Sequence, residues 1–180
     1  MFDGKIRQTW IFGVTKETNG TWTHVVTPNA PSAREQYAMA SSGGGDTVIL
    51  FGGEYLDGSE IFSDTWKFDL ATMDWTQLSV TSPPSARAGH AMASQKNSGM
   101  VLLFGGVDND NNNLNDTWTF DQTTNVWTKV DTKSTAPPGR YYHAMAALGD
   151  GGGVLLFGGQ DLTQHFGDTW AFNPTTRQWT

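Results

Sequence analysis

Short motifs recur along this 180-residue chain at a nearly constant spacing. Phe-Gly-Gly begins at Phe51, Phe104 and Phe157, in steps of 53 residues. Asp-Thr-Trp recurs in steps of 52 residues, and a second tryptophan follows the Trp of each motif after nine residues. A sequence period of this length is typical of propellers and other repeat architectures. The period therefore restricts the fold to a series of similar units.

The repeated markers divide the whole chain into units. The eight tryptophans form four pairs, one in each unit. Trp10 and Trp22 form the first pair, and the wider gap between them predicts a longer turn. We predict one propeller domain made of a half unit, residues 1–26, and three full units, residues 27–78, 79–130 and 131–180.

Each full unit contains four segments with the patterns of short strands. In the middle unit these are residues 89–94, 100–104, 116–121 and 127–130, separated by turn-forming residues. The half unit supplies only the last two strands. No segment has the pattern of a long helix. The sequence therefore predicts an all-β fold built from blades of four antiparallel strands.

The motifs resemble those of kelch repeats, in the galactose oxidase/kelch-like superfamily. The shared features are Arg and then His in the first strand, Phe-Gly-Gly ending the second, an aromatic residue in the third and Trp in the fourth. The resemblance covers essentially the whole chain and implies a β-propeller. Kelch propellers include both binding proteins and enzymes, so the resemblance leaves the function open.

Three and a half blades do not close an ordinary ring, because propellers close with about 4–8 blades. We therefore expect an incomplete ring per chain, with apolar blade faces exposed at its ends. Two explanations stay open. Either the chain is an excerpt of a longer kelch protein, as its end at Trp179 and Thr180 suggests, or several copies assemble a ring. The predicted partners are thus the rest of a longer parent chain or further copies of this chain.

The amino-acid composition excludes several kinds of chemistry and of binding partner. The chain contains no cysteine, which removes disulfides and thiolate nucleophiles. Its 18 acidic residues outnumber 11 lysines and arginines that form no basic run, so we expect no nucleic-acid binding. No apolar run approaches the roughly 20 residues of a membrane helix, and no signal peptide is visible. We predict a soluble protein with no membrane partner and leave its compartment open.

Candidate binding residues lie where the first strand of each full blade begins. Each blade has one arginine there: Arg34, Arg87 and Arg140. Such guanidinium groups could bind a carboxylate or an acidic peptide. Alternatively, they could pair with backbone carbonyls or with an Asp of a neighbouring blade and so fix blade packing. Three residues later stand His90 and His143, with Tyr37 in the first full blade. Because these residues recur in the repeat, a structural role is the favoured interpretation.

The loops between the second and third strands differ between blades, and function often resides where repeats diverge. Each loop carries an acidic residue soon after Phe-Gly-Gly: Glu54, Asp108 and Asp161. The loop at Asp108 lacks the glycine and the glutamate that a calcium loop requires. Asp161 and His165 match part of the iron site of the plant specifier proteins, but Phe157 replaces its glutamate. We therefore predict no metal site and no cofactor.

All of these candidates should lie at one end of the blades, because the loops before the first strand and after the second emerge at the same end. The favoured function is a kelch module that binds a ligand or a protein, such as a peptide or an acidic ligand, through these loops. One alternative is an enzyme, a hydrolase or lyase, that uses the same arginine, histidine and acidic residues. The other is a structural, self-associating repeat segment. No catalytic residue is assigned.

Overall fold

A computed structural model describes residues 8–15, 18–41, 45–95, 98–133, 135–149 and 153–180. The prediction of an all-β fold with four-stranded antiparallel blades is confirmed. The residues described contain no helix, and therefore none that is long and apolar enough to cross a membrane.

Three sheets have four strands each, and strands consecutive in the sequence are antiparallel neighbours. Blade 1 contains β3 (Ala38–Ser41), β4 (Thr47–Phe51), β5 (Thr65–Asp69) and β6 (Asp74–Gln77). Blade 2 contains β7 (Ala91–Gln95), β8 (Met100–Phe104), β9 (Thr117–Asp121) and β10 (Val126–Val130). Blade 3 contains β11 (Ala144–Ala147), β12 (Val154–Phe157), β13 (Thr169–Asn173) and β14 (Gln178–Trp179).

A two-stranded hairpin precedes blade 1. It consists of β1 (Thr9–Thr15) and β2 (Thr18–Val25). The rings of Phe12 and Trp22 lie 5.2 Å apart, as do the rings of Phe68 and Trp75 on β5 and β6. The hairpin is therefore the counterpart of the two outer strands of a blade.

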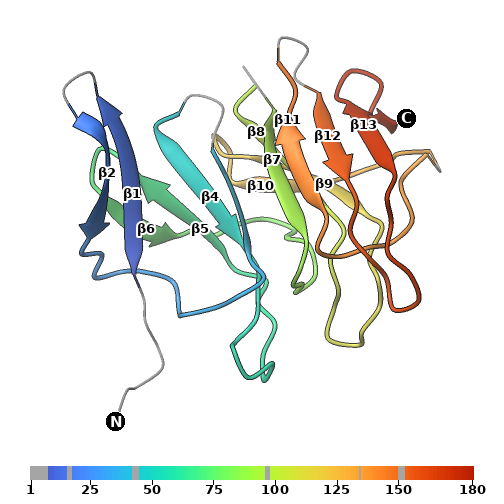
Figure 1. The fold of residues 1–180 in the computed structure, drawn as a ribbon, viewed down its shortest axis with the longest axis horizontal. Coiled ribbons are helices and arrows are strands. Elements are labelled where there is room, and N and C mark those ends of the chain that lie inside the picture. Colours follow the sequence, from blue (N-terminus) through green and yellow to red (C-terminus); the bar gives the residue numbers. More distant parts are fainter. Residues whose placement is uncertain (1–7, 16–17, 42–44, 96–97, 134, 150–152) are drawn as a thin grey trace.

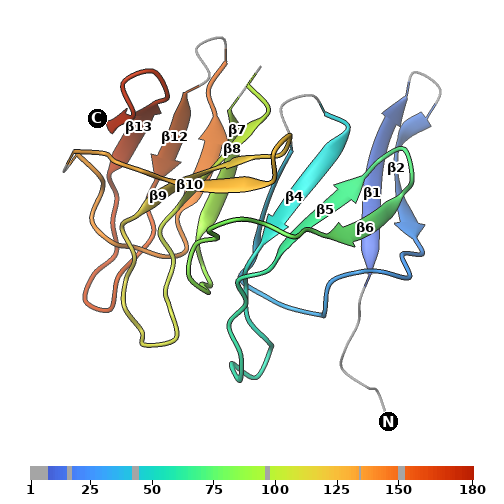
Figure 2. The same ribbon diagram turned by 180° about the vertical axis from the view of Figure 1, so that it is seen from behind.

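The blades are arranged as an open fan, with the β1–β2 hairpin at one end and blade 3 at the other (Figures 1 and 2). The first strands of the blades, β3, β7 and β11, lie side by side along the inner edge of the fan. The described residues close no ring. The hydrophobic core lies between blades, where Phe51 and Ile49 of blade 1 meet Val101 and Trp127 of blade 2. A similar cluster joins blades 2 and 3.

The tryptophan of each last strand links its blade to the preceding unit. Its indole N–H donates a hydrogen bond to the threonine that begins the third strand of that unit. The bonds are Trp75 to Thr9 at 2.9 Å, Trp127 to Thr65 at 3.0 Å and Trp179 to Thr117 at 3.0 Å. These repeated bonds explain why the paired tryptophans share one period with the Asp-Thr-Trp motif.

We expect Thr117→Val to lower the free energy of unfolding by about 1–3 kcal/mol, because it leaves the buried indole N–H of Trp179 without its acceptor. Thr169 has the same position in blade 3 but is exposed, so Thr169→Val should change stability by less than about 0.5 kcal/mol. Chemical denaturation measures both values. Equal losses would show that the bond between blades does not contribute to stability.

The double glycines bring the loops close to the strand entrances. Gly106 has a φ of 99°, and a Cβ atom there would lie 2.8 Å from the carbonyl oxygen of Ala88. Only glycine tolerates both the left-handed backbone and this close approach. As a result Val107, the next residue, forms an isolated bridge with Ala88 at the entrance to β7.

Candidate functional site

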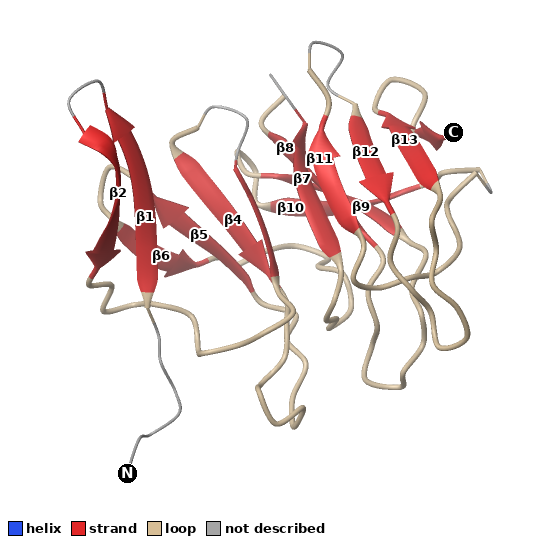
Figure 3. Ribbon diagram, viewed as in Figure 1, coloured by secondary structure: helices blue, strands red, loops and turns tan. Residues whose placement is uncertain are grey.

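The strand entrances and the loops that carry the predicted site residues lie at one end of the blades, at the lower edge of Figure 3. We define the loop face as the strand entrances, residues 34–37, 87–90 and 140–143, together with the loops 52–64, 105–116 and 158–168. Ten acidic residues and three arginines stand in these ranges. The net charge of this face is therefore −7, the same as that of the whole chain. The charged residues outside this face contribute no net charge.

Each of the three arginines forms an ion pair with an aspartate of its own blade, and we call each of these pairs a clamp. Arg87 is fully buried and uses every guanidinium N–H group. It donates to both carboxylate oxygens of Asp116, at 2.7 and 3.0 Å, to the carbonyl of Gly105, and to the carbonyl and hydroxyl of Ser85. Arg34 pairs with Asp64 in the same way, and Arg140 with Asp168. The clamp therefore connects the strand entrance, which holds the arginine, to the end of the loop, which holds the aspartate.

Electrostatics within the clamps favours the ionised carboxylates. Burial disfavours the charge of Asp116, but the hydrogen bonds and charge of Arg87 outweigh it, and the pKa of Asp116 falls below its usual value. Hydrogen bonds from Arg140 lower the pKa of Asp168 to about 2. The structural alternative predicted an Asp of a neighbouring blade as the partner, and this is wrong, because each partner lies in the same blade. A binding role for these arginines stays a prediction that their contacts do not support.

The histidines are packed between blades. The ring of His90 lies edge-on to Phe51 of the preceding blade, with centroids 5.7 Å apart, and His143 lies likewise against Phe104 at 5.5 Å. Burial, followed by the charge of the adjacent arginine, lowers the pKa of His90 to about 3 and that of His143 to about 4. Both rings are therefore neutral at physiological pH. The part of the chain that the structure describes holds no group of three potential metal ligands from His, Asp and Glu.

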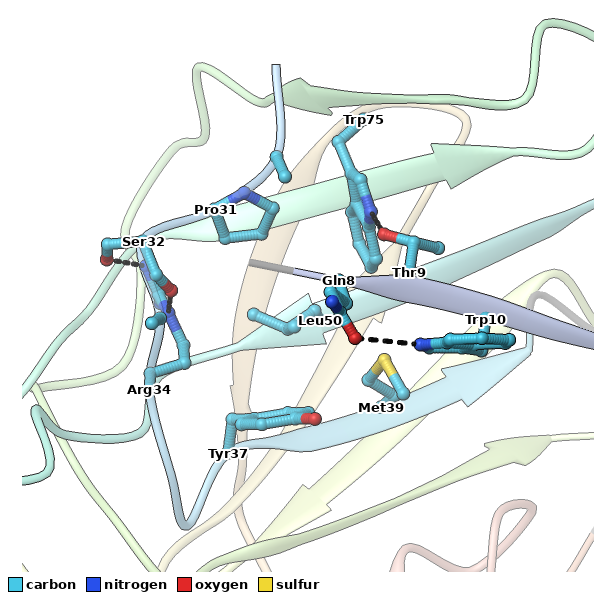
Figure 4. A pocket seen from close by; sticks show the side chains of 12 residues that line it. Gln8, Thr9, Trp10, Pro31, Ser32, Arg34, Tyr37, Met39, Leu50 and Trp75 are labelled. Carbon is cyan, nitrogen blue, oxygen red and sulfur yellow. Dashed lines mark hydrogen bonds between the residues drawn. The ribbon is translucent and has the colours of Figure 1, made fainter. Parts of the chain in front are cut away.

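Tyr37 has different surroundings from the two histidines. It is 41% exposed, whereas His90 is 5% exposed. Tyr37 lines a cavity of about 300 Å³ between the hairpin and blade 1, opposite Trp10 and near Met39 and Leu50 (Figure 4). Tyr37 therefore faces a cavity that Arg34 also lines, rather than a packed interface between blades like those that hold His90 and His143.

Two of the loop acids stabilise their own turns. Asp108 accepts backbone N–H groups of Asp110 and Asn112 at 3.0 and 2.9 Å. Asp161 accepts the backbone N–H groups of Thr163 and Gln164 at 2.7 and 2.8 Å, and these hydrogen bonds lower the pKa of Asp161. His165 is exposed at the end of the same turn. Asp108 and Asp161 thus remain charged, but each acts mainly within its own loop.

Glu54 belongs to a cluster that spans blades. Its carboxylate accepts a hydrogen bond from the amide of Gln36, and its backbone pairs with that of Glu35 at 2.9 Å. Burial and the charge of Glu35 raise the pKa of Glu54. Burial and the charge of Glu54 raise the pKa of Tyr142 in blade 3. Tyr142 is 56% exposed and contacts the ring of Tyr141. We name these five residues the acidic corner.

Apart from Glu54, the residues of the acidic corner were overlooked in the predictions from the sequence, although two of them share a repeat position. Gln36, Gly89 and Tyr142 are 53 residues apart, and all have left-handed backbones, with φ of 56°, 66° and 57°. The N–H of Gly89 donates to the carbonyl of Gln36, and the N–H of Tyr142 donates to that of Gly89. The signal was a repeat position with variable side chains, two residues after the constant arginine.

Comparison with known proteins gives one family. Residues 3–180 match the KLHDC2/KLHL20/DRC7 Kelch-repeats domain. Tip elongation aberrant protein 1 of Schizosaccharomyces pombe is 31% identical over 87% of this chain. Kelch domain-containing protein 2 of Bos taurus is 32% identical over 75% of it, and an F-box/kelch-repeat protein of Arabidopsis thaliana is 27% identical over 86%. These matches cover 14%, 32% and 37% of the respective relatives, so the chain spans a minor part of each.

Proposed function

Because the chain belongs to the kelch-repeat family, we propose that it is a protein-interaction module whose loop face binds a basic segment of a partner protein. The observation that carries this proposal is the charge of the loop face. Its only Lys or Arg side chains are the three arginines of the clamps, while seven acidic residues stand outside the clamps. A negative face accelerates association with a positive partner and disfavours an acidic one.

The acidic corner supports a lysine or arginine as the anchoring residue of the partner. Glu35 and Glu54 provide two carboxylates, which form charge-assisted hydrogen bonds with guanidinium or ammonium groups. The exposed ring of Tyr142 offers a face for a cation–π contact. The predicted acidic ligand required free guanidinium groups, and the clamps engage those of Arg34, Arg87 and Arg140.

Variation between blades supports a partner that lies across the face. At the bridge between entrance and loop, blade 1 has Glu35 and Glu54, blade 2 has Ala88 and Val107, and blade 3 has Tyr141 and Gln160. At these positions blade 1 presents acidic side chains and blade 3 presents an aromatic ring and an amide. Blade 2 presents only Val107, because Ala88 is fully buried. An extended peptide that crosses the three blades would meet a different surface at each one, which provides specificity. The enzyme alternative stays a prediction, and the neutral, packed histidines lend it no support.

The test uses a displayed library of random peptides selected on the purified chain. We expect the selected peptides to be enriched in Lys and Arg and to lose about tenfold or more in affinity for Glu54→Gln, because one charge-assisted hydrogen bond contributes about 1.5–3 kcal/mol. Tyr142→Ala should weaken them similarly. Glu60→Gln is the matched control, because Glu60 is exposed on the same loop but outside the corner. Calorimetry or fluorescence anisotropy measures the affinities.

Two results would contradict the proposal. One is selection of peptides without a basic residue, which would remove the charge argument. The other is equal binding to the wild type, Glu54→Gln and Tyr142→Ala, which would place the binding surface elsewhere. Melting curves of each variant show whether a lost affinity reflects lost folding instead.

A further inference from the structure

The two interfaces between four-stranded blades differ towards the end opposite the loop face. Between blades 1 and 2, the hydroxyl of Thr47 at the start of β4 donates a hydrogen bond to the side-chain oxygen of Gln122 in the β9–β10 turn, at 2.9 Å. Between blades 2 and 3 the equivalent residues are Met100 and Pro174, whose side chains cannot form this bond. A cavity of about 270 Å³ lies between blades 2 and 3 at this place.

The cavity has an apolar lining and one buried polar side chain. Met100 and Val130 of blade 2 and Phe172 and Pro174 of blade 3 provide the apolar part. Gln95, at the end of β7, also lines the cavity and is only 6% exposed. Its amide nitrogen is buried and has no hydrogen-bond partner among the residues that the structure describes. A buried donor without an acceptor is costly, so this amide suits a ligand that supplies one.

The charges around the cavity favour an anion. Lys129 of β10 and Arg177 of the β13–β14 turn both line it, and none of the described lining residues is acidic. Both cations are exposed, and neither forms an ion pair with a described residue. Asp121, the cross-strand partner of Met100, accepts the backbone N–H of Thr123 within its own turn at 2.8 Å. The cavity thus has two cations available for a negatively charged group.

The polar groups of the cavity are not part of the repeat. The equivalent positions of the other described blades hold different side chains, none of them charged. Leu148 corresponds to Gln95, Gln77 to Lys129, and Met73 and Asn125 to Arg177. A group that only holds blades together is expected to recur in each blade, as the arginines of the clamps do. These three groups therefore fit a function that belongs to this one interface.

We propose that the cavity between blades 2 and 3 binds a small organic carboxylate. The carboxylate pairs with Arg177 and Lys129 and accepts a hydrogen bond from the amide of Gln95, which turns towards it. A planar carboxylate matches the guanidinium group, and the apolar lining favours an aromatic or branched aliphatic body over a purely polar ion. The cavity lies outside the loop face, so this site does not depend on the proposed function.

Benzoate is the probe, titrated into the whole chain at neutral pH and followed by calorimetry. We expect saturable one-to-one binding in the millimolar range or tighter. Benzamide, which has the same shape without the charge, should bind at least about tenfold more weakly. Arg177→Gln and Lys129→Gln should each weaken benzoate binding by about tenfold, because each removes one charged partner. Lys67→Gln is the matched control, because it removes a cation of blade 1 that does not line the cavity.

A second variant tests the cavity itself. Met100→Thr combined with Pro174→Gln installs the residues that join blades 1 and 2, and it should abolish benzoate binding by filling the space. Because Arg177 is exposed, Arg177→Gln keeps the proposal testable even where the double variant fails to fold.

Four results would overturn the proposal. Benzoate that shows no saturable binding would remove the site, and equal affinities for benzoate and benzamide would show an apolar cavity without anion selectivity. Unchanged benzoate affinity in both Arg177→Gln and Lys129→Gln would place the binding elsewhere. Tighter binding of inorganic phosphate than of benzoate would show a site for simple oxyanions, in which the apolar lining has no role.

Discussion

Arg87→Ala is expected to lower the free energy of unfolding by about 3–5 kcal/mol, because it leaves the carboxylate of Asp116 partly buried without its cation. The loss also removes donors from the carbonyls of Gly105 and Ser85. For a domain of this size, each kcal/mol shifts the melting temperature by about 2–4 °C. The expected fall is therefore roughly 10 °C. Calorimetry or circular dichroism at neutral pH measures it.

Arg177→Ala provides the control, because Arg177 is exposed and its loss should change stability by less than about 0.5 kcal/mol. Arg87→Lys should recover only part of the loss, because an ammonium group cannot reproduce the planar two-point pairing with Asp116. A variant Arg87→Ala that melts like the wild type but no longer binds the selected peptides would reverse the interpretation. The arginines would then belong to the binding surface.

The blade architecture was predictable because it depends on local patterns that every unit repeats. The predicted strand 100–104 agrees with β8, and the predicted strand 116–121 differs from β9 by one residue. Double glycines mark a turn that side chains would obstruct, as at Gly106. Apolar alternation indicated the strands, and the constant tryptophans indicated the contacts between blades. Four copies of one pattern reduce the ambiguity of each single copy.

The site was less predictable because a shared repeat period does not identify which of the repeated residues are in contact. The repeat itself suggested that Arg87 has a structural role, but it did not identify Asp116, 29 residues away, as its partner. The acidic corner spans blades through backbone hydrogen bonds from Gly89 to Gln36 and from Tyr142 to Gly89. Nothing in the sequence predicts these contacts.

Acidification is expected to destabilise the protein because its buried histidines must remain neutral. His90 and His143 have pKa values of about 3 and 4 in the folded state, against 6.5 for an unperturbed histidine. Between these values the unfolded chain binds more protons, so stability is complete above pH 6.5 and falls as the pH decreases. From pH 7 to pH 5 the two histidines together should remove about 2–4 kcal/mol. Urea unfolding at a series of pH values measures this loss.

Variants that lack a titratable ring test whether the loss of stability comes from these two histidines. His90→Gln and His143→Gln should each lower stability at neutral pH but reduce the slope with pH by up to one proton, and the double variant should lose most of it. His165→Gln is the matched control, because this exposed histidine lies outside the packed interface between blades. Asp116 and Asp168 should not contribute to this loss above pH 5. Their pKa values are lowered in the folded state, so the stability that they provide is lost only in stronger acid. A wild-type stability that stays constant from pH 7 to pH 5 would mean that the rings accept protons without leaving the interface, and it would contradict their assignment as neutral packing groups.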